Sequence, residues 1–217
     1  MPIDLGFVAR IAPTLAQGLA TTLALAIPAI VLAALWGVPV VIGLMARARP
    51  VSVLTATYVE VVRNTPVLVQ MFFIFFGSGV VGYPLSGFTA ALLALVLQNG
   101  AYIAEIYRGG IRSVTHRQAE AGLALGLTPR RAFRIIVLPQ AFRKVIPSLS
   151  NQGVLMIKDT SLAATISVAE LTFQARLLAD RTAAVFEIFF TLALFYLALT
   201  AVFAGAMRLL ELRARIA

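Results

Sequence analysis

The sequence contains no cysteine and a single histidine, which excludes disulfide bridges, thiol chemistry and metal centres built from Cys and His clusters. Charge is also scarce: 12% of the 217 residues are charged, against about 25% in soluble domains. Hydrophobic residues make up 60% of the chain, and the mean hydropathy is +0.94. A soluble core has no room for this much apolar surface, so the composition predicts an integral membrane protein.

Lysine is nearly absent, and the only two are Lys144 and Lys158. Neither follows a G-x-x-x-x-G sequence, so the chain lacks the phosphate loop through which many ATPases hold nucleotide. We therefore expect no catalytic residues and no cofactor in this chain. A membrane enzyme is disfavoured because no serine elbow, histidine cluster or metal constellation is present.

Long charge-poor runs predict an all-α fold with five transmembrane helices. Each run supplies the ~20 apolar residues that cross ~30 Å of hydrocarbon. No internal repeat or linker interrupts the chain, so we expect a single membrane domain over residues 1–217. The expected spans are about 17–46, 54–77, 86–106, 145–168 and 185–207.

The basic residues indicate how the spans are oriented, because cytoplasmic loops carry an excess of Lys and Arg. Thirteen cations fall on one side of the predicted membrane and three on the other. This asymmetry places the amino terminus outside and the carboxyl terminus inside. It also explains the net charge of +9 without a nucleic-acid partner. The three on the outer side are Arg10, Arg176 and Arg181.

A motif of fixed spacing lies in the basic loop between the third and fourth spans. It resembles the E-A-A-x3-G-x9-I-x-L-P signature of permease subunits of bacterial ATP-binding-cassette importers, with glycine in place of the second alanine. The matching residues are Glu120, Ala121, Gly122, Gly126, Ile136, Leu138 and Pro139.

Further motifs are similar to those of the polar amino acid uptake family, the histidine/glutamine/arginine permease-like proteins. They begin at Gly18, Tyr58, Gly100 and Lys158, reading GLATTLAL, YVEVVRNTPVLVQ, GAYIAEIYRGGI and KDTSL. This resemblance implies the membrane domain of a type I importer, with cytoplasmic coupling helices within a segment of about 107–144.

The composition of the coupling segment predicts two short helices joined by a sharp turn at Gly126. Thr128 and Pro129 are suited to the N-cap and first position of the second helix, which we expect Pro139 to end or kink. The resemblance implies that this segment docks on an ATPase. The alternative is an amphipathic helix that lies on anionic lipid.

Two pairs of ionisable residues lie at the inner ends of the second and third spans. Glu60 and Arg63, like Glu105 and Arg108, are three residues apart and share a helix face. Charges at membrane depth are costly and are usually paired or functional. These four residues form either an ion-pair network between two helices or a cytoplasmic gate.

Polar residues within the third and fourth spans are candidates for the substrate pathway. Asp159 suits the ammonium group of an amino acid, and Lys158 or a helix dipole suits its carboxylate. The alternative is hydrogen bonding between helices. The candidates are Gln98, Asn99, Tyr102, Gln152, Lys158, Asp159, Thr160 and Ser161.

The resemblance as a whole implies a multi-pass permease in the bacterial plasma (inner) membrane, which imports a polar amino acid or a related zwitterion. Its partners would be two copies of an ATPase subunit, which would carry the ATP and Mg, a second identical or related permease, an external solute-binding protein and membrane lipid. The alternative from a different class is a passive channel or facilitator for small polar solutes, without ATP coupling.

Overall fold

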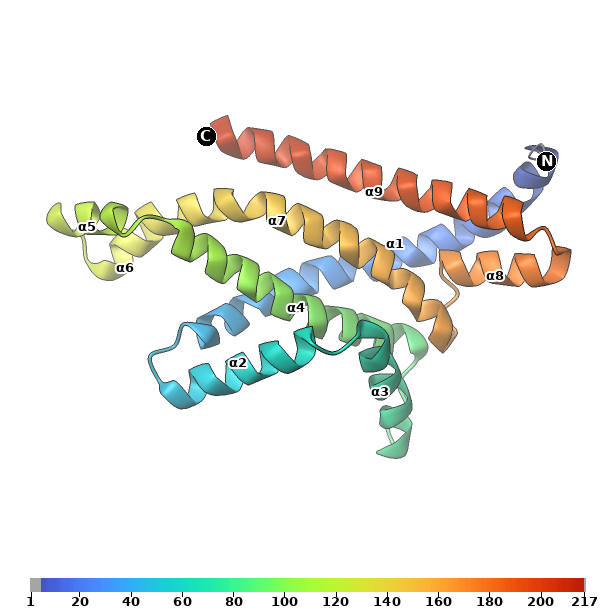
Figure 1. The fold of residues 1–217 in the computed structure, drawn as a ribbon, viewed down its shortest axis with the longest axis horizontal. Helices are drawn as coiled ribbons and strands as arrows, with labels where there is room; N and C mark the ends of the chain where they lie inside the picture. The colour runs from blue at the N-terminus through green and yellow to red at the C-terminus, as the bar shows by residue number, and fades with distance from the viewer. Residues whose placement is uncertain (1–4, 217) are drawn as a thin grey trace.

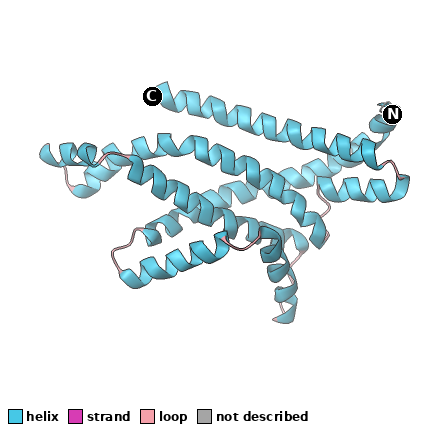
Figure 2. Cartoon of the chain, viewed as in Figure 1, coloured by secondary structure: helices cyan, strands magenta, loops and turns pink. Residues whose placement is uncertain are grey.

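The structure is a computed structural model that describes residues 5–216, and all regular structure in that range is helical (Figure 2). This confirms the predicted all-α class. The elements are α1 (Leu5–Leu44), α2 (Arg49–Arg63), α3 (Val67–Val80), α4 (Gly87–Ser113), α5 (His116–Ala124), α6 (Pro129–Ala132), the π-helical turn η1 (Phe133–Val137), α7 (Leu138–Asp159), the 3-10 helix η2 (Thr160–Ile166), α8 (Leu171–Thr182) and α9 (Val185–Ile216).

Among the residues that the structure describes, three helices are long and apolar enough to cross a membrane, within Gly6–Leu44, Gly87–Ser113 and Val185–Arg213. They correspond to the first, third and fifth predicted spans, and each extends past one end of its predicted span. The pair α2 and α3 brings the number to four if it counts as one span. The predicted fourth span, 145–168, is α7 followed by η2. It does not reach the same apolarity, because it contains polar and charged residues such as Asn151, Gln152 and Lys158.

The predicted span over 54–77 is not one continuous helix. The chain breaks between α2 and α3, whose axes differ in direction by 103°. Pro66 has no amide hydrogen and disfavours helical backbone at the residue before it. The side chains of Asn64 and Thr65 also turn back and donate hydrogen bonds of 2.8 Å to the carbonyls of Glu60 and Val61.

The largest core cluster joins α1, α3, α4 and α7. Small residues line the contact between α1 and α4, where Ala29 and Ala33 are fully buried together with Ala90, Ala91 and Ala94. Helices in lipid associate through this kind of close backbone approach. The same cluster contains larger buried side chains, which include Leu25, Met71, Leu95 and Met156.

Most of the helix ends, apart from those of α3 and the α2–α3 junction, fall into two groups in space (Figure 1). The α1–α2 connection, α5, α6 and the end of α9 lie toward one end of the molecule, and the start of α1 and α8 lie toward the other. The loops that carry most of the cations therefore share one end. Their cytoplasmic location stays a prediction from the charge distribution.

We expect Gly100→Ala to destabilise the fold, because an added Cβ would lie 2.4 Å from Cδ1 of the Trp36 ring on α1. Such overpacking costs about 1–3 kcal/mol of unfolding free energy. Gly109→Ala in the same helix is the matched control, since a Cβ there meets nothing within 4 Å. Thermal unfolding in detergent should show a lower Tm for the first variant and an unchanged or higher Tm for the second.

Candidate functional site

Helices α5 and α6 form a tight hairpin in the segment that carries the E-A-A motif. The turn between them depends on Gly126, whose φ of +81° favours glycine. It is closed by the amide of Leu127, which donates to the carbonyl of Gly122 over 3.1 Å. Thr128 caps α6 by accepting a 3.4 Å bond from the amide of Arg131, with Pro129 at the first position. The predicted turn and cap are confirmed.

Pro139 was expected to end or kink the second helix of the hairpin, and it does not end it. The helix widens into the π turn η1, where the amide of Leu138 donates to the carbonyl of Phe133, five residues earlier. It then continues directly into α7. A π turn shifts the hydrogen-bond register, which accommodates a proline that would otherwise clash with the preceding turn. The hairpin is thus continuous with a helix 22 residues long.

The motif residues divide between the inside and the outside of the hairpin. Gly122 is buried, and a Cβ at this position would lie 2.5 Å from Cδ1 of Ile136, so the glycine that replaces the usual alanine leaves room for Ile136. Glu120 and Ala121 are exposed, and Leu125 at the tip is 84% exposed. An apolar side chain this exposed at the end of a hairpin is available to a partner.

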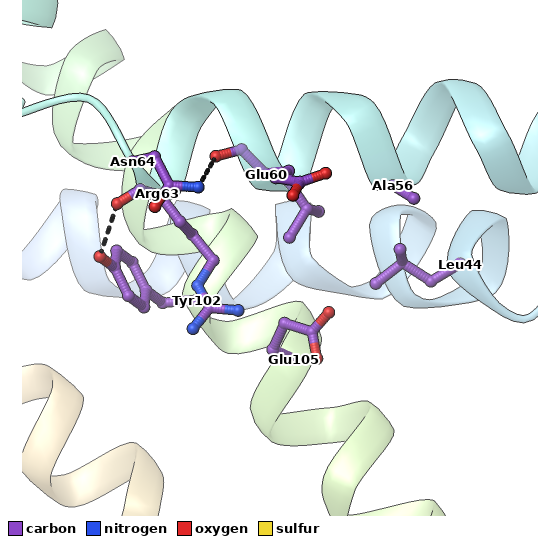
Figure 3. A pocket seen from close by; sticks show the side chains of 8 residues that line it. Leu44, Ala56, Glu60, Arg63, Asn64, Tyr102 and Glu105 are labelled. Carbon is purple, nitrogen blue, oxygen red and sulfur yellow. Dashed lines mark hydrogen bonds between the residues drawn. The ribbon is translucent and has the colours of Figure 1, made fainter.

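A cavity of about 490 Å³ lies where α2 meets α4 (Figure 3). The guanidinium of Arg63 lies 4.9 Å from the centre of the Tyr102 ring, and the Tyr102 hydroxyl donates a 3.1 Å hydrogen bond to the carbonyl of Arg63. Stacking of this kind holds a cation without neutralising it. The lining residues are Leu44, Ala56, Val59, Glu60, Arg63, Asn64, Tyr102 and Glu105.

One of the two predicted ion pairs is present. Arg108 donates to Oε2 of Glu105 from Nη2 at 2.5 Å and from Nε at 3.0 Å. Glu60 and Arg63 form no ion pair, because Arg63 turns across the cavity onto Tyr102 of α4 instead of back along α2 (Figure 3). The structure thus brings Glu60, Arg63 and Glu105 to one cavity, with Arg108 attached through Glu105.

Asn99 and Gln152 connect α4 to α7. Gln152 donates a 2.7 Å hydrogen bond from Nε2 to Oδ1 of Asn99, whose own amide donates to the carbonyl of Leu95 over 2.8 Å. Asn99 is 1% exposed. Gln98, the neighbour of Asn99, differs: its Oε1 is buried and has no hydrogen-bond partner among the described residues.

The remaining pathway candidates lie at the other end of α7, where it tightens into η2. Thr160 is buried and donates over 2.6 Å to the carbonyl of Ile157. Lys158 is exposed, whereas Asp159 and Ser161 are half-buried. Within residues 5–216, Lys158 and Asp159 have neither an ion pair nor a side-chain hydrogen bond. The predicted pathway residues therefore form separate groups, of which only Tyr102 lines the cavity beside α2.

Gln70 is a residue that the sequence reasoning missed. Its Nε2 donates to the carbonyls of Val62 and Thr65 over 2.9 and 3.0 Å, which satisfies backbone groups left free by the break before α3. The Thr65-Pro66 dipeptide was the available signal, because it predicts extended backbone inside an apolar run.

Comparison with known proteins gives a consistent result. Residues 37–216 match the family model described as binding-protein-dependent transport system inner membrane component. The glutamine transport system permease protein GlnP of Escherichia coli (strain K12) is 42% identical over 161 residues, which cover 73% of this chain and 74% of that protein. The nopaline transport system permease protein NocM of Agrobacterium fabrum is 36% identical over 219 residues, which cover 96% and 91%.

Solved structures show the same similarity. A crystal structure of an amino acid ABC transporter with histidines contains a chain that superposes with a TM-score of 0.92 and 33% identity, covering 98% of this chain and 100% of that one. A chain of the inward-facing MetNI methionine ABC transporter superposes with a TM-score of 0.78 and 17% identity, covering 93% and 96%, which establishes a shared fold alone.

We expect Gly126→Ala to loosen the hairpin and Gly126→Asn to preserve most of its stability. Left-handed backbone costs most residues about 1–2 kcal/mol, whereas asparagine adopts it more readily. No steric clash complicates the comparison, since a Cβ at Gly126 meets nothing within 4 Å. Hydrogen exchange of a peptide covering residues 122–128 should accelerate in the alanine variant. Equal exchange in both variants would show that the turn does not depend on its φ.

A double-mutant cycle tests whether Asn99 and Gln152 hold α4 to α7. We expect Asn99→Leu and Gln152→Leu to show a coupling of about 0.6–1.7 kcal/mol in unfolding free energy, as interhelical hydrogen bonds in membranes do. Asn99→Leu combined with Asn151→Leu is the control, because Asn151 is exposed and should contribute no coupling. Equal coupling in the two cycles would contradict a specific bond.

Proposed function

The chain belongs to the family of binding-protein-dependent transport system inner membrane components, and we propose that it moves a polar amino acid across the membrane by using the ATPase activity of a separate subunit. It is a multi-pass inner-membrane permease subunit of an amino-acid ABC importer. The relatives named for glutamine and nopaline transport support a polar amino acid or a related zwitterion as substrate.

The continuity of the α5–α6 hairpin with α7 carries this proposal. If the hairpin ended in flexible loops, its displacement by a partner would not reach the membrane helices. Because it continues into a long helix, the displacement is transmitted. The exposed face with Glu120, Ala121 and Leu125 would dock in a cleft of the ATPase. Closure of two ATPase subunits would then move the attached helices α4 and α7. Gly126, Ile136, Leu138 and Pro139 maintain the shape of this connection.

The cavity beside α2 is suited to a cytoplasmic gate, since it lies toward the same end of the molecule as the hairpin. α4 carries Tyr102 and Glu105 on the cavity and leads directly toward α5, so displacement of the hairpin reaches the cavity through one helix. Arg63 is held by stacking on a ring and by no carboxylate. It can therefore change partner, to Glu60 or Glu105, at little electrostatic cost.

The proposed substrate pathway consists of the candidate polar side chains that form no hydrogen bond within the described part of the fold. Asp159 would bind the substrate ammonium and Lys158 its carboxylate, with Ser161 and the unpaired carbonyl of Gln98 as further contacts. Asn99, Gln152 and Thr160 are already engaged in hydrogen bonds within the fold and are assigned a structural role.

The proposed assembly contains two such permeases, identical or related, two ATPase subunits that hold ATP and Mg, and an external solute-binding protein. The binding protein would dock at the end of the molecule that carries α8. ATP binding would open the pathway to the outside, and hydrolysis would return it to the inward-facing state. A passive channel has no use for the hairpin, which makes dependence on ATP the discriminating property.

The test is ATPase activity in proteoliposomes that contain this chain with its ATPase, measured with and without loaded binding protein. We expect loaded binding protein to stimulate hydrolysis, and Glu120→Lys or Gly126→Pro to abolish the stimulation because each disrupts the docking hairpin. Glu120→Gln and Gly126→Asn are matched controls that keep size or backbone geometry and should retain much of it. Solute flux through the chain without an ATPase, or full stimulation in both disruptive variants, would instead establish a passive pathway.

A further inference from the structure

Two further cavities lie on the side of the hairpin where α1, α4 and α7 meet. The first is an apolar groove of about 360 Å³, within the size range of small-molecule sites. Its walls come from α1, α4, η1 and α7, and its side chains Ile42, Val38 and Phe142 are exposed. The lining residues are Val38, Val41, Ile42, Tyr107, Ile111, Phe133, Leu138, Ala141, Phe142 and Val145.

The groove offers almost no polar group to a ligand. Its one hydroxyl, on Tyr107, donates to the carbonyl of Ala34 over 3.2 Å and is already engaged. An occupant of the groove is therefore a hydrocarbon chain rather than a polar solute such as an amino acid. This separates the groove from the proposed transport pathway.

The second cavity, of about 530 Å³, adjoins the groove and is lined by three apolar residues and two arginines. Phe133 and Leu138 line both spaces. Pro129, Arg130 and Arg134 complete the second one. None of the residues that line either cavity is acidic. A ligand with an apolar chain and a negatively charged head would match both the apolar lining and the two arginines.

We propose that the two adjoining cavities bind one anionic phospholipid of the cytoplasmic leaflet, with an acyl chain in the groove and its phosphate on Arg130 and Arg134. Basic pockets between transmembrane helices on the cytoplasmic side recognise such headgroups. A second permease copy would cover the apolar groove but would not account for two cations beside it. The charge therefore favours lipid over protein as the occupant.

The π turn η1 connects this lipid site to the hairpin. η1 supplies Phe133 to the groove and Arg134 to its mouth, and π turns frequently occur at functional sites. A lipid bound there ties the start of the hairpin-to-α7 connection to α1. The lipid would thus hold the segment that passes movement from the hairpin to the membrane helices.

Native mass spectrometry of the full chain, purified in detergent, tests this site. We expect one phosphatidylglycerol to remain bound under conditions that remove phosphatidylcholine with the same acyl chains. Arg130→Gln with Arg134→Gln should weaken retention by about fivefold per arginine, roughly thirtyfold for both. Arg117→Gln with Arg208→Gln, which removes two cations that line neither cavity, should leave retention unchanged.

A second variant pair tests the groove independently of charge. Val38→Trp should fill it and displace the lipid, whereas Val31→Trp, two turns earlier on α1 and outside the groove, should not. Both positions are exposed, at 45% and 52%, so neither change disturbs the core. Excess glycerol phosphate should fail to compete because it lacks a chain.

Three results would overturn the lipid site. The first is equal retention of the two lipids, and the second is loss of ATPase association without loss of lipid in the double arginine variant. The third is loss of a permease dimer, rather than of lipid, in Val38→Trp. None of these measurements requires transport, so failure of the lipid site leaves the importer assignment intact.

Discussion

The bend between α2 and α3 is stable inside a membrane because side chains, rather than water, form hydrogen bonds with its backbone polar groups. In hydrocarbon each unpaired carbonyl costs several kcal/mol, so a break in a span survives only where side chains replace the lost helical bonds. Gln70 and Tyr102 donate to carbonyls that the break leaves free, and Asn64 adds a bond to the carbonyl of Glu60. The same Tyr102 holds Arg63 in place, so one side chain from α4 both stabilises the bend and shapes the cavity beside it.

Because Tyr102 belongs to α4, this helix links the cavity to the hairpin. α4 supplies Tyr102 and Glu105 at the cavity and leads into α5 after a two-residue connection, while α7 begins as the direct continuation of the second arm through η1. Both helices are bridged inside the bundle by Asn99 and Gln152. A force applied at the hairpin would therefore act on two helices that move together. The proposed lipid would add a third attachment, to α1.

The sequence predicted the features that depend on local chemistry and composition. The helical class followed from charge-poor runs, and the hairpin followed from Gly126 and the Thr128-Pro129 cap. The predictions that failed concern residues whose conformation is determined by tertiary contacts and not by the local sequence. Arg63 was expected to pair with Glu60, but it stacks on the Tyr102 ring of α4 instead. Pro139 was expected to end or kink a helix, and a π turn carries the helix past it without ending it. Neither the Tyr102 contact nor the π turn has a local signature.

The most direct measurement is the distance between spin labels on Ala56, which lines the cavity from α2, and Leu125, at the exposed tip of the hairpin. The chain contains no cysteine, so Ala56→Cys and Leu125→Cys provide the only two attachment sites in each copy of this chain. If a partner's ATP cycle drives the cavity through the hairpin, the distance distribution changes when ATP and loaded binding protein are added to the assembled complex. An unchanged distribution while the labelled complex continues to import its substrate would contradict this coupling.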